Sequence, residues 1–349
     1  MFRTLPLIAG ILISSHSQAA TQDDAPWTFN LYFENDLFAE TDQNYTNGVR
    51  VSWVSPNVES YLEDERLPSW VGELSDSLPL FDPPSSSDDP VLRNVVVTLG
   101  QQIYTPQDID RATVDPDDRP YAGWLYGGVA YHSRTRNQMN SAVLNLGIVG
   151  PWALGEEAQD LIHDIRGFKK FNGWDNQLKN EPGIQLLYEH KNRINKGRLT
   201  PLLAYDLILH GGGSLGNVAT YLNAGAELRL GWNLPQDFGT SALRSGGDNS
   251  APGIGDGRYQ RGSRNSNLGL HGFISADGRW VLRDIFLDGN TFRDSHSIDK
   301  ESLVGETAIG IAALYHGWKI SFARVHRSRE YAGQEEGHTF GSLSLSYSY

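Results

Sequence analysis

Long stretches of this chain alternate apolar and polar residues with a period of two, and this pattern limits the fold more than any other feature. In residues 221–232, Leu222 and Leu230 lie on one face, and Asn223 and Glu227 lie on the other. Such alternation is typical of strands with one apolar and one polar face. A soluble β-sandwich alternates too, but several of these stretches reach the roughly 9–11 residues that a tilted transmembrane strand needs. We therefore predict an all-β transmembrane antiparallel β-barrel.

The alternating stretches predict twelve strands, an even number, as single-chain bacterial barrels have. We expect them at residues 27–36, 45–54, 92–104, 122–134, 139–149, 183–193, 199–210, 218–233, 267–284, 302–315, 317–328 and 339–349. The ninth strand is the weakest of these, because Ala276, Asp277 and Gly278 could instead form a turn inside it.

The connections follow from this count. With both termini in the periplasm, the extracellular connections would be 37–44, 105–121, 150–182, 211–217, 285–301 and 329–338. Three periplasmic turns are expected to be short, at 134–137, 191–198 and 316–317. Two others, 55–91 and 234–266, are long and are expected to be surface loops.

The first twenty residues have the layout of a secretory signal peptide. Arg3 precedes an apolar stretch at 5–13, and small residues follow up to Ala20. We therefore expect a signal peptide at 1–20 and a single barrel domain at 21–349. Because no later stretch has 18 consecutive apolar residues, an exported chain of this kind would enter a membrane as a closed barrel.

Charge and cysteine content narrow the function. The formal net charge of −13 argues against a nucleic-acid binder, which would carry a basic surface. The chain has no cysteine, which excludes a thiol nucleophile, a disulfide framework and a cysteine zinc site.

The extracellular connection 150–182 contains a helical pattern at 155–167. Apolar residues recur there at helical spacing: Ala158, Leu161, Ile162 and Ile165. Gly167 follows as an expected C-cap. His163 lies off the apolar stripe, so it is either exposed or turned toward something polar. An imidazole titrates near neutral pH and can act as a general base, although a lone exposed histidine commonly has no such role.

Oxygen-bearing side chains gather at the first hairpin. Residues 34–36 (Glu-Asn-Asp) end the first predicted strand, and residues 44–48 (Asn-Tyr-Thr-Asn-Gly) open the second. Turns favour these residue types. Carboxylate, amide and hydroxyl oxygens are also the ligands that Ca²⁺ prefers. Taken alone, the hairpin is better explained as a turn, with a calcium site as the alternative. The hairpin, the His163 helix and the loop with Arg111 and Arg119 all fall on the extracellular rim, where together they suit a hydrolase site.

The chain resembles the outer-membrane lipid A 3′-O-deacylase (LpxR) family. The similarity rests on residues 34–36 and 44–48, on 102–106, 118–123, 146–151 and 174–178, and on His163 with Gly167, in the order found in the family. It runs from residue 27 to about 190, and the remaining residues fit as barrel strands. The resemblance implies a twelve-stranded barrel with a calcium-dependent esterase site near its outer rim.

The resemblance also implies roles for single residues. His163 matches the catalytic histidine, Asn35 and Asp36 match an essential pair, and Thr46 matches a hydroxyl residue of the next strand. Arg111 falls where the family has a basic residue thought to meet the substrate head group. One position departs from the family pattern, because Lys169 stands where members can carry an essential glutamate. Asp164 or Asp175 could replace that glutamate, and the sequence does not choose between them.

The expected mechanism is direct hydrolysis of a fatty-acyl ester of lipid A in lipopolysaccharide. His163 would act as general base on a water, with Ca²⁺ bound by Asp36, Asn35 and Thr46 stabilising the oxyanion. Arg111 and Arg119 would attract a substrate phosphate, although Arg119 could instead be structural. We expect a monomer in the bacterial outer membrane, with its site toward the extracellular leaflet.

Two other functions are weighed. A passive porin or structural barrel would need no site at all. A phospholipase A would need a serine nucleophile beside a histidine on adjacent strands, and the sequence shows no such pair.

Strand parity predicts where the site faces. If Phe29, Leu31 and Phe33 point to lipid, Asn35 points outward and Asp36 inward. By the same count, Thr46 points inward and its neighbours Tyr45 and Asn47 outward. A one-residue bulge would change this assignment. The site requires the His163 helix to lie on the same side of the barrel as the first two strands.

Overall fold

The computed structural model describes residues 26–36, 44–57, 82–86, 89–167, 169–240, 251–253, 256–258 and 268–349, without the side chains of 44–46 and 166. The predicted signal peptide at 1–20 lies outside these residues. The strands are β1 (Thr28–Asn35), β2 (Asn44–Val54), β3 (Leu92–Thr105), β4 (Ala122–Arg134), β5 (Gln138–Val149), β6 (Glu181–Arg198), β7 (Ala204–Gly216), β8 (Ala219–Trp232), β9 (Gly269–Asp284), β10 (Leu303–Tyr315), β11 (Trp318–Arg327) and β12 (His338–Ser348). The helices are α3 (Gly155–Arg166) and α4 (Ile285–Asp288), with 3-10 turns η3 (Pro151–Ala153) and η4 (Trp174–Asn176).

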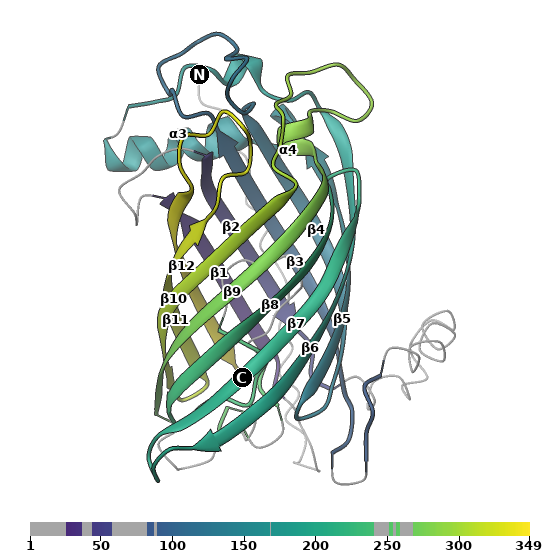
Figure 1. Ribbon diagram of the computed structural model, residues 1–349, viewed down its shortest axis with the longest axis vertical. Coiled ribbons are helices and arrows are strands. Elements are labelled where there is room, and N and C mark those ends of the chain that lie inside the picture. Colours follow the sequence, from purple (N-terminus) through teal and green to yellow (C-terminus); the bar gives the residue numbers. More distant parts are fainter. Residues whose placement is uncertain are drawn as a thin grey trace, which may run out of the picture.

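The twelve strands form one closed barrel in which every neighbouring pair is antiparallel (Figure 1). β1 closes the barrel against β12, with Thr28 opposite Ser348 and Asn35 opposite Gly341. The predicted barrel and its strand number are therefore confirmed, and the β-sandwich alternative is wrong. We call the end that carries α3 and α4 the helix end, and the end where Trp27 pairs with Tyr349 the closing end.

Two hairpins differ from the expectation. The connection predicted at 211–217 is mostly strand, because β7 continues to Gly216 and β8 begins at Ala219. The turn predicted at 191–198 is part of β6, which continues to Arg198, and the turn lies instead between Leu199 and Leu203. A bulge between Arg193 and Asn195 explains the error, because it breaks the period-two pattern while the strand continues. β9 runs unbroken through Ala276, Asp277 and Gly278, so the alternative turn there is absent.

The wall has an apolar outer surface and a polar lumen. Leu99, Val129, Leu146 and Leu186 are each half-exposed on the outside, whereas residues of the opposite parity, such as Arg229, are buried inside. A barrel embedded in lipid requires this distribution of side chains. Among the described residues, no helix has the length and apolar character to cross a membrane.

The long link 234–266 is not a surface loop as expected. Its described residues enter the lumen at the closing end, where Asp237 and Phe238 are buried. Arg134 of β4 donates two hydrogen bonds to the link, to the carbonyls of Ala251 (2.6 Å) and Pro252 (2.9 Å). We call these described residues, 234–240, 251–253 and 256–258, the plug. The position of the plug inside the lumen could not be predicted, because the link has no regular apolar pattern.

Asp237 holds the plug through three cations. Arg229 of β8 (2.5 Å), Arg258 of the plug (2.9 Å) and Lys319 of β11 (2.7 Å) all contact its carboxylate, and all four side chains are buried. Burial of Asp237 raises the pKa of its carboxyl. The charges of Lys319, Arg229 and Arg258 lower the pKa by more than burial raises it, so it lies well below its usual range. A lowered carboxyl pKa contributes stability above about pH 4, which is lost as the pH falls through the folded value. The plug should therefore stay docked at pH 5.

Asp237→Ala should destabilise the barrel by about 3–5 kcal/mol, because it removes the carboxylate that Lys319 contacts and one of the two carboxylates paired with each of Arg229 and Arg258, all of which are buried. The free energy of unfolding in urea would measure this. Asp294→Ala, at an exposed position, is the control and should change it by less than about 0.5 kcal/mol. Equal stability of the two variants would show that Asp237 does not hold the plug.

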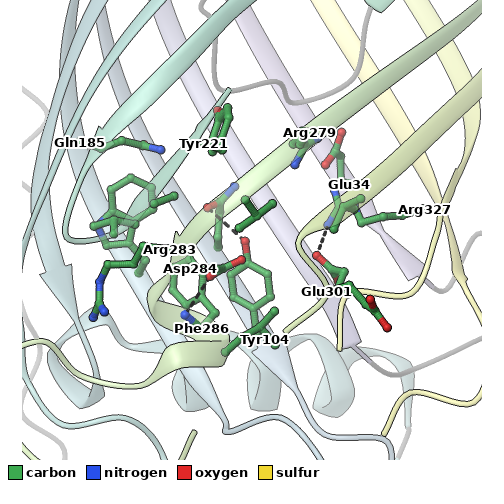
Figure 2. A pocket seen from close by; sticks show the side chains of 18 residues that line it. Glu34, Tyr104, Gln185, Tyr221, Arg279, Arg283, Asp284, Phe286, Glu301 and Arg327 are labelled. Carbon is green, nitrogen blue, oxygen red and sulfur yellow. Dashed lines mark hydrogen bonds and ion pairs between the residues drawn. The ribbon is translucent and has the colours of Figure 1, made fainter. Parts of the chain in front are cut away.

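A cavity lies in the lumen beneath α4 (Figure 2). Glu34, Tyr104, Arg279 and Arg327 line it from different strands, and Phe286 of α4 stacks on Tyr104 with ring centroids 4.2 Å apart. Glu34 therefore belongs to the interior of the barrel, as parity predicts. Its neighbour Asn35 follows the outward set of β1.

Candidate active site

Helix α3 forms where the sequence predicts it. It begins at Gly155 and ends at Arg166, and Gly167 caps it in the left-handed conformation (φ 71°), with its N–H donating to the carbonyl of His163. Glycine suits this position because a side chain there would be strained.

The start of α3 packs on the outside of the barrel wall. A Cβ added at Gly123 of β4 would lie 3.2 Å from Ala153 Cβ and 3.2 Å from Gly155 Cα, so a side chain there would require its neighbours to move by a few tenths of an ångström. Gln101 of β3 points outward and donates from Nε2 to the carbonyls of Ala153 (2.7 Å) and Leu154 (3.1 Å). Figure 1 shows α3 projecting beyond the outline of the barrel at the helix end.

The segment after α3 is fixed to the β3–β4 loop. The N–H groups of Asn172 and Leu178 donate to the carbonyls of Ile109 (3.1 Å) and Tyr121 (2.9 Å). An apolar cluster fills the space beneath, and its buried members are Ile103, Tyr121, Phe171 and Trp174. The helix and its following segment therefore form one packed unit against the wall.

His163 is buried, with 2% of its surface exposed, so it is turned toward a polar group and not toward solvent. Its Nδ1 lies 2.6 Å from the carbonyl oxygen of Lys169, and its ring meets Phe171 edge-on with centroids 5.2 Å apart. A carbonyl can only accept, so the neutral imidazole must carry its proton on Nδ1. Nε2 is then the basic nitrogen, as a general base requires.

Lys169 occupies the position of the family glutamate. Its side chain is mostly exposed and pairs with Asp110 of the β3–β4 loop. Because the backbone carbonyl of Lys169 orients His163, the orientation does not depend on the side chain at this position. Of the two candidate substitutes, Asp164 pairs with Lys170 at 3.0 Å on the exposed side of α3, and Asp175 lies in η4, which follows the Phe171 segment.

A row of outward-facing residues crosses four strands below α3. Gly123, Ile103, Asn47 and Asn35 are successive cross-strand partners on β4, β3, β2 and β1. Asn35 and Asn47 are buried, at 3% and 4% exposed, although outward residues elsewhere on the wall are half-exposed. Ile103, beside Asn47, is covered by the apolar cluster of the α3 segment, with Ala158 packed against it.

The length of α3 matches the length of this row. Gly155 touches Gly123, and eight residues later His163 lies about 12 Å further along the helix axis. The row from Gly123 to Asn35 spans three strand spacings, about 14 Å. Ala158 packs against the cluster that contains Ile103, which fits this direction. A helix that follows the row would bring His163 over Asn47 and Asn35.

Helix α3 therefore lies on the side of the barrel where the first two strands are, as the candidate site requires. It contacts β3 and β4, which follow β2 in the wall, and not the opposite side of the barrel.

Two details of the parity prediction change. β1 ends at Asn35, and Asp36 begins a 3-10 turn, so alternation does not fix the side that Asp36 faces. The β2–β3 register shifts by one residue between Tyr45 and Asn47, which makes Thr46 a bulge residue. In the strand register Tyr45 is therefore opposite Tyr104, so simple alternation does not carry from Asn47 to Tyr45.

The donor set suits a hard cation. Asp36 is fully buried, and a buried carboxylate is stable only with a compensating charge or donors. Asn47 Oδ1 is buried and, within the described residues, has no hydrogen-bond partner. A carboxylate and amide oxygens beside a hydroxyl residue match the preference of Ca²⁺. No group of three or more His, Cys, Asp or Glu side chains positioned for a metal occurs in the part of the chain described.

The two arginines differ in their surroundings. Arg111 is about a third exposed in the β3–β4 loop, where it pairs with Asp115. Arg119 is buried, 3.3 Å from Glu330, and its guanidinium carbon lies 4.7 Å from the centroid of the Tyr104 ring. The geometry of Arg119 fits the structural alternative.

Sequence reasoning missed Gln159. It lies one turn before His163 on the same buried face of α3, and its Oε1 accepts from Trp174 Nε1 at 3.1 Å. Its Nε2 is buried and makes no hydrogen bond within the described ranges. Spacing of four residues from His163 was the available signal.

A serine does lie beside a histidine on adjacent strands, contrary to the expectation from the sequence. His132 and Ser141 are opposite each other on β4 and β5. Both are buried, near the closing end, and Ser141 Oγ has no hydrogen-bond partner among the described residues. A serine nucleophile needs a hydrogen bond to its base, so this pair does not form an activated dyad.

A family model described as outer membrane protein LpxR matches residues 5–349. The chain belongs to the LpxR family. Among solved structures, LpxR from Salmonella typhimurium superposes with a TM-score of 0.69 at 16% identity, over 92% of this chain and 100% of that one. The beta domain of the Bordetella autotransporter Brka has a TM-score of 0.43 at 9% identity, over 94% of this chain and 99% of that one. A search of curated proteins finds no significant match.

Membership of the LpxR family confirms the resemblance seen in the sequence and places the chain in the outer membrane. The likeness to the Salmonella LpxR structure shows the shared fold, a twelve-stranded barrel with few helices.

Proposed function

We propose that this LpxR-family chain is a lipid A deacylase that hydrolyses a fatty-acyl ester, at the 3′-position by family resemblance, on the outer face of the barrel wall. One observation carries the proposal: the outward residues Asn35 and Asn47 are buried where the wall would otherwise meet lipid. The packed α3 unit carries a buried histidine with its basic nitrogen defined. A lipid ester could then reach the site sideways from the outer leaflet without entering the lumen.

His163 is the proposed general base. Its Nδ1–H donates to the carbonyl of Lys169, so Nε2 can take a proton from an attacking water. The contact with Phe171 fixes the ring and keeps bulk water away. The chain has no cysteine, and the nearest serine–histidine pairing is inactive, so direct attack by water is favoured over an acyl-enzyme.

Asp36, with Asn35 and Thr46, is proposed to hold Ca²⁺, and Asn47 adds a further amide oxygen to this hairpin. Bound there, the ion would polarise the ester carbonyl and stabilise the developing oxyanion. Arg111, partly exposed beside the α3 segment, is the proposed contact for a phosphate of the head group.

Mass spectrometry of lipid A incubated with purified protein and Ca²⁺ tests the proposal. Loss of one acyl chain, with release of the free fatty acid, is the expected result. Unchanged lipid A across several acylation patterns would contradict it.

The plug argues against the porin alternative. At the closing end, its residues lie between β4 on one side and β8 and β11 on the other, joined by buried ion pairs. Planar-bilayer recordings should therefore show no steady conductance, whereas a porin would show one.

Gln159→Leu should lower kcat/KM about 10-fold, since one uncharged hydrogen-bond donor to a reacting group contributes about 1.4 kcal/mol or more to the transition state. We expect its Nε2 to donate to substrate or to the attacking water beside His163. Gln107→Leu, which loses a hydrogen bond to Tyr331 Oη away from α3, is the matched control and should retain activity. Equal rates for wild type and Gln159→Leu would remove Gln159 from the site.

A further inference from the structure

Helix α3 has three distinct faces. The face against the wall carries Gly155, Gln159 and His163, which are all buried. Successive residues are about 100° apart around a helix. On that count, two exposed flanks lie on either side of the wall-facing residues, and they differ sharply in chemistry.

One flank is acidic. Glu156, Asp160 and Asp164 lie along it at spacings of four residues, and Lys170 bridges Asp160 and Asp164 at 3.0 Å each. These charges suit water.

The other flank is apolar and unusually exposed. Ile165 is 76% exposed and Leu161 61%, and just before the helix Trp152 is 70% and Leu154 49% exposed. We call Trp152, Leu154, Leu161 and Ile165 the apolar flank. The apolar stripe predicted for this helix thus exists, but Leu161 and Ile165 face away from the protein and not into it.

The apolar flank continues the lipid-facing surface of the barrel. Gln101 on β3 binds the carbonyls of Ala153 and Leu154, which places this segment at the level of Gln101 on the outer wall. The next outward residue of β3 toward the closing end is Leu99, 54% exposed in the apolar belt, about 7 Å away along the strand. No polar side chain of β3 separates the two on this outer face.

We propose that the apolar flank of α3 is embedded among the acyl chains of the outer leaflet, with the helix lying in the plane of the interface. Leu161 and Ile165 would enter the hydrocarbon, Trp152 would sit at its boundary, and the acidic flank would face water. A helix with one apolar and one charged flank binds interfaces in this way, and tryptophan favours the boundary region. Lipid is preferred as the partner over a second protein because the patch is continuous with the lipid-facing belt.

The chain contains no cysteine, which makes a site-specific test direct. Single variants Leu161→Cys and Ile165→Cys are labelled with the environment-sensitive fluorophore NBD and reconstituted into phosphatidylcholine vesicles. Glu156→Cys, on the acidic flank of the same helix and about 140° around it from Leu161, is the matched control. Each is quenched separately by nitroxide on lipid acyl chains and by aqueous iodide.

We expect the nitroxide lipid to quench labels at 161 and 165 several-fold more than the label at 156, and iodide to show the reverse order. Similar quenching at all three positions would overturn the proposal, because the apolar flank would then not enter lipid. A protein partner would be the remaining occupant, and no partner is present in the vesicles. The readout does not involve hydrolysis, so it can fail independently of the proposed activity.

Discussion

Replacing His163 by alanine is expected to lower the rate of lipid A deacylation at least about 10²-fold, the usual scale for loss of a general base. The expectation rests on the buried imidazole, whose Nδ1 proton is held by the Lys169 carbonyl and whose Nε2 is basic. Initial rates on purified lipid A in Ca²⁺ would measure the loss. Because His163 is on a helix outside the wall, the barrel should remain folded by heat-modifiable gel migration.

Lys169→Ala is the control for this experiment. It removes the exposed side chain and its pairing with Asp110 but keeps the carbonyl that orients His163. Activity should stay within a few-fold of wild type. A folded His163→Ala protein with near-normal turnover would exclude His163 from the mechanism. A Lys169→Ala protein as inactive as His163→Ala would show that the side chain, and not the carbonyl, matters.

Removal of Ca²⁺ by a chelator is expected to abolish deacylation, and added Ca²⁺ should restore it. The proposed ligands are hard oxygens, which bind Ca²⁺ in preference to softer metals. Asp36→Asn should reproduce the loss, at least about 10²-fold, because it removes the only carboxylate charge proposed to hold the ion.

Glu34→Gln is the matched control for Asp36. It changes a carboxylate only two residues away, but Glu34 lines the luminal cavity on the other side of the wall (Figure 2). It should keep Ca²⁺-dependent activity. Full activity in excess chelator would contradict the calcium proposal. Equal losses in both variants would indicate that the site is not confined to the outer face.

The fold was predictable because a lipid-embedded barrel imposes a strict pattern on its sequence. Every strand must alternate, as residues 221–232 do, and the number of strands must close the wall. Prediction failed where local geometry interrupts that pattern. The bulge at 193–195 moved the β6–β7 turn, and the bulge at Thr46 shifted the register at the hairpin. A single inserted residue leaves no signal in the composition of a strand.

The candidate site was only partly predictable. The position of His163 on a helix followed from apolar spacing and from Gly167. Its burial did not, since Leu161 and Ile165 suggested that the opposite face would be buried. Gln159 was missed because its significance depends on its contact with Trp174, 15 residues away in the sequence. The contact between the Lys169 carbonyl and His163 was not predictable either, because every residue carries a backbone carbonyl whatever its side chain.

The contacts of Asp237 have a consequence for the order of assembly. Arg229 and Arg258 flank Asp237 in sequence, but Lys319 follows it by 82 residues and belongs to the penultimate strand. The plug can therefore make its full set of ion pairs only after β11 has joined the wall. Before that step Asp237 would have Arg229 and Arg258 as partners, but not Lys319. Completion of the plug therefore depends on closure of the wall.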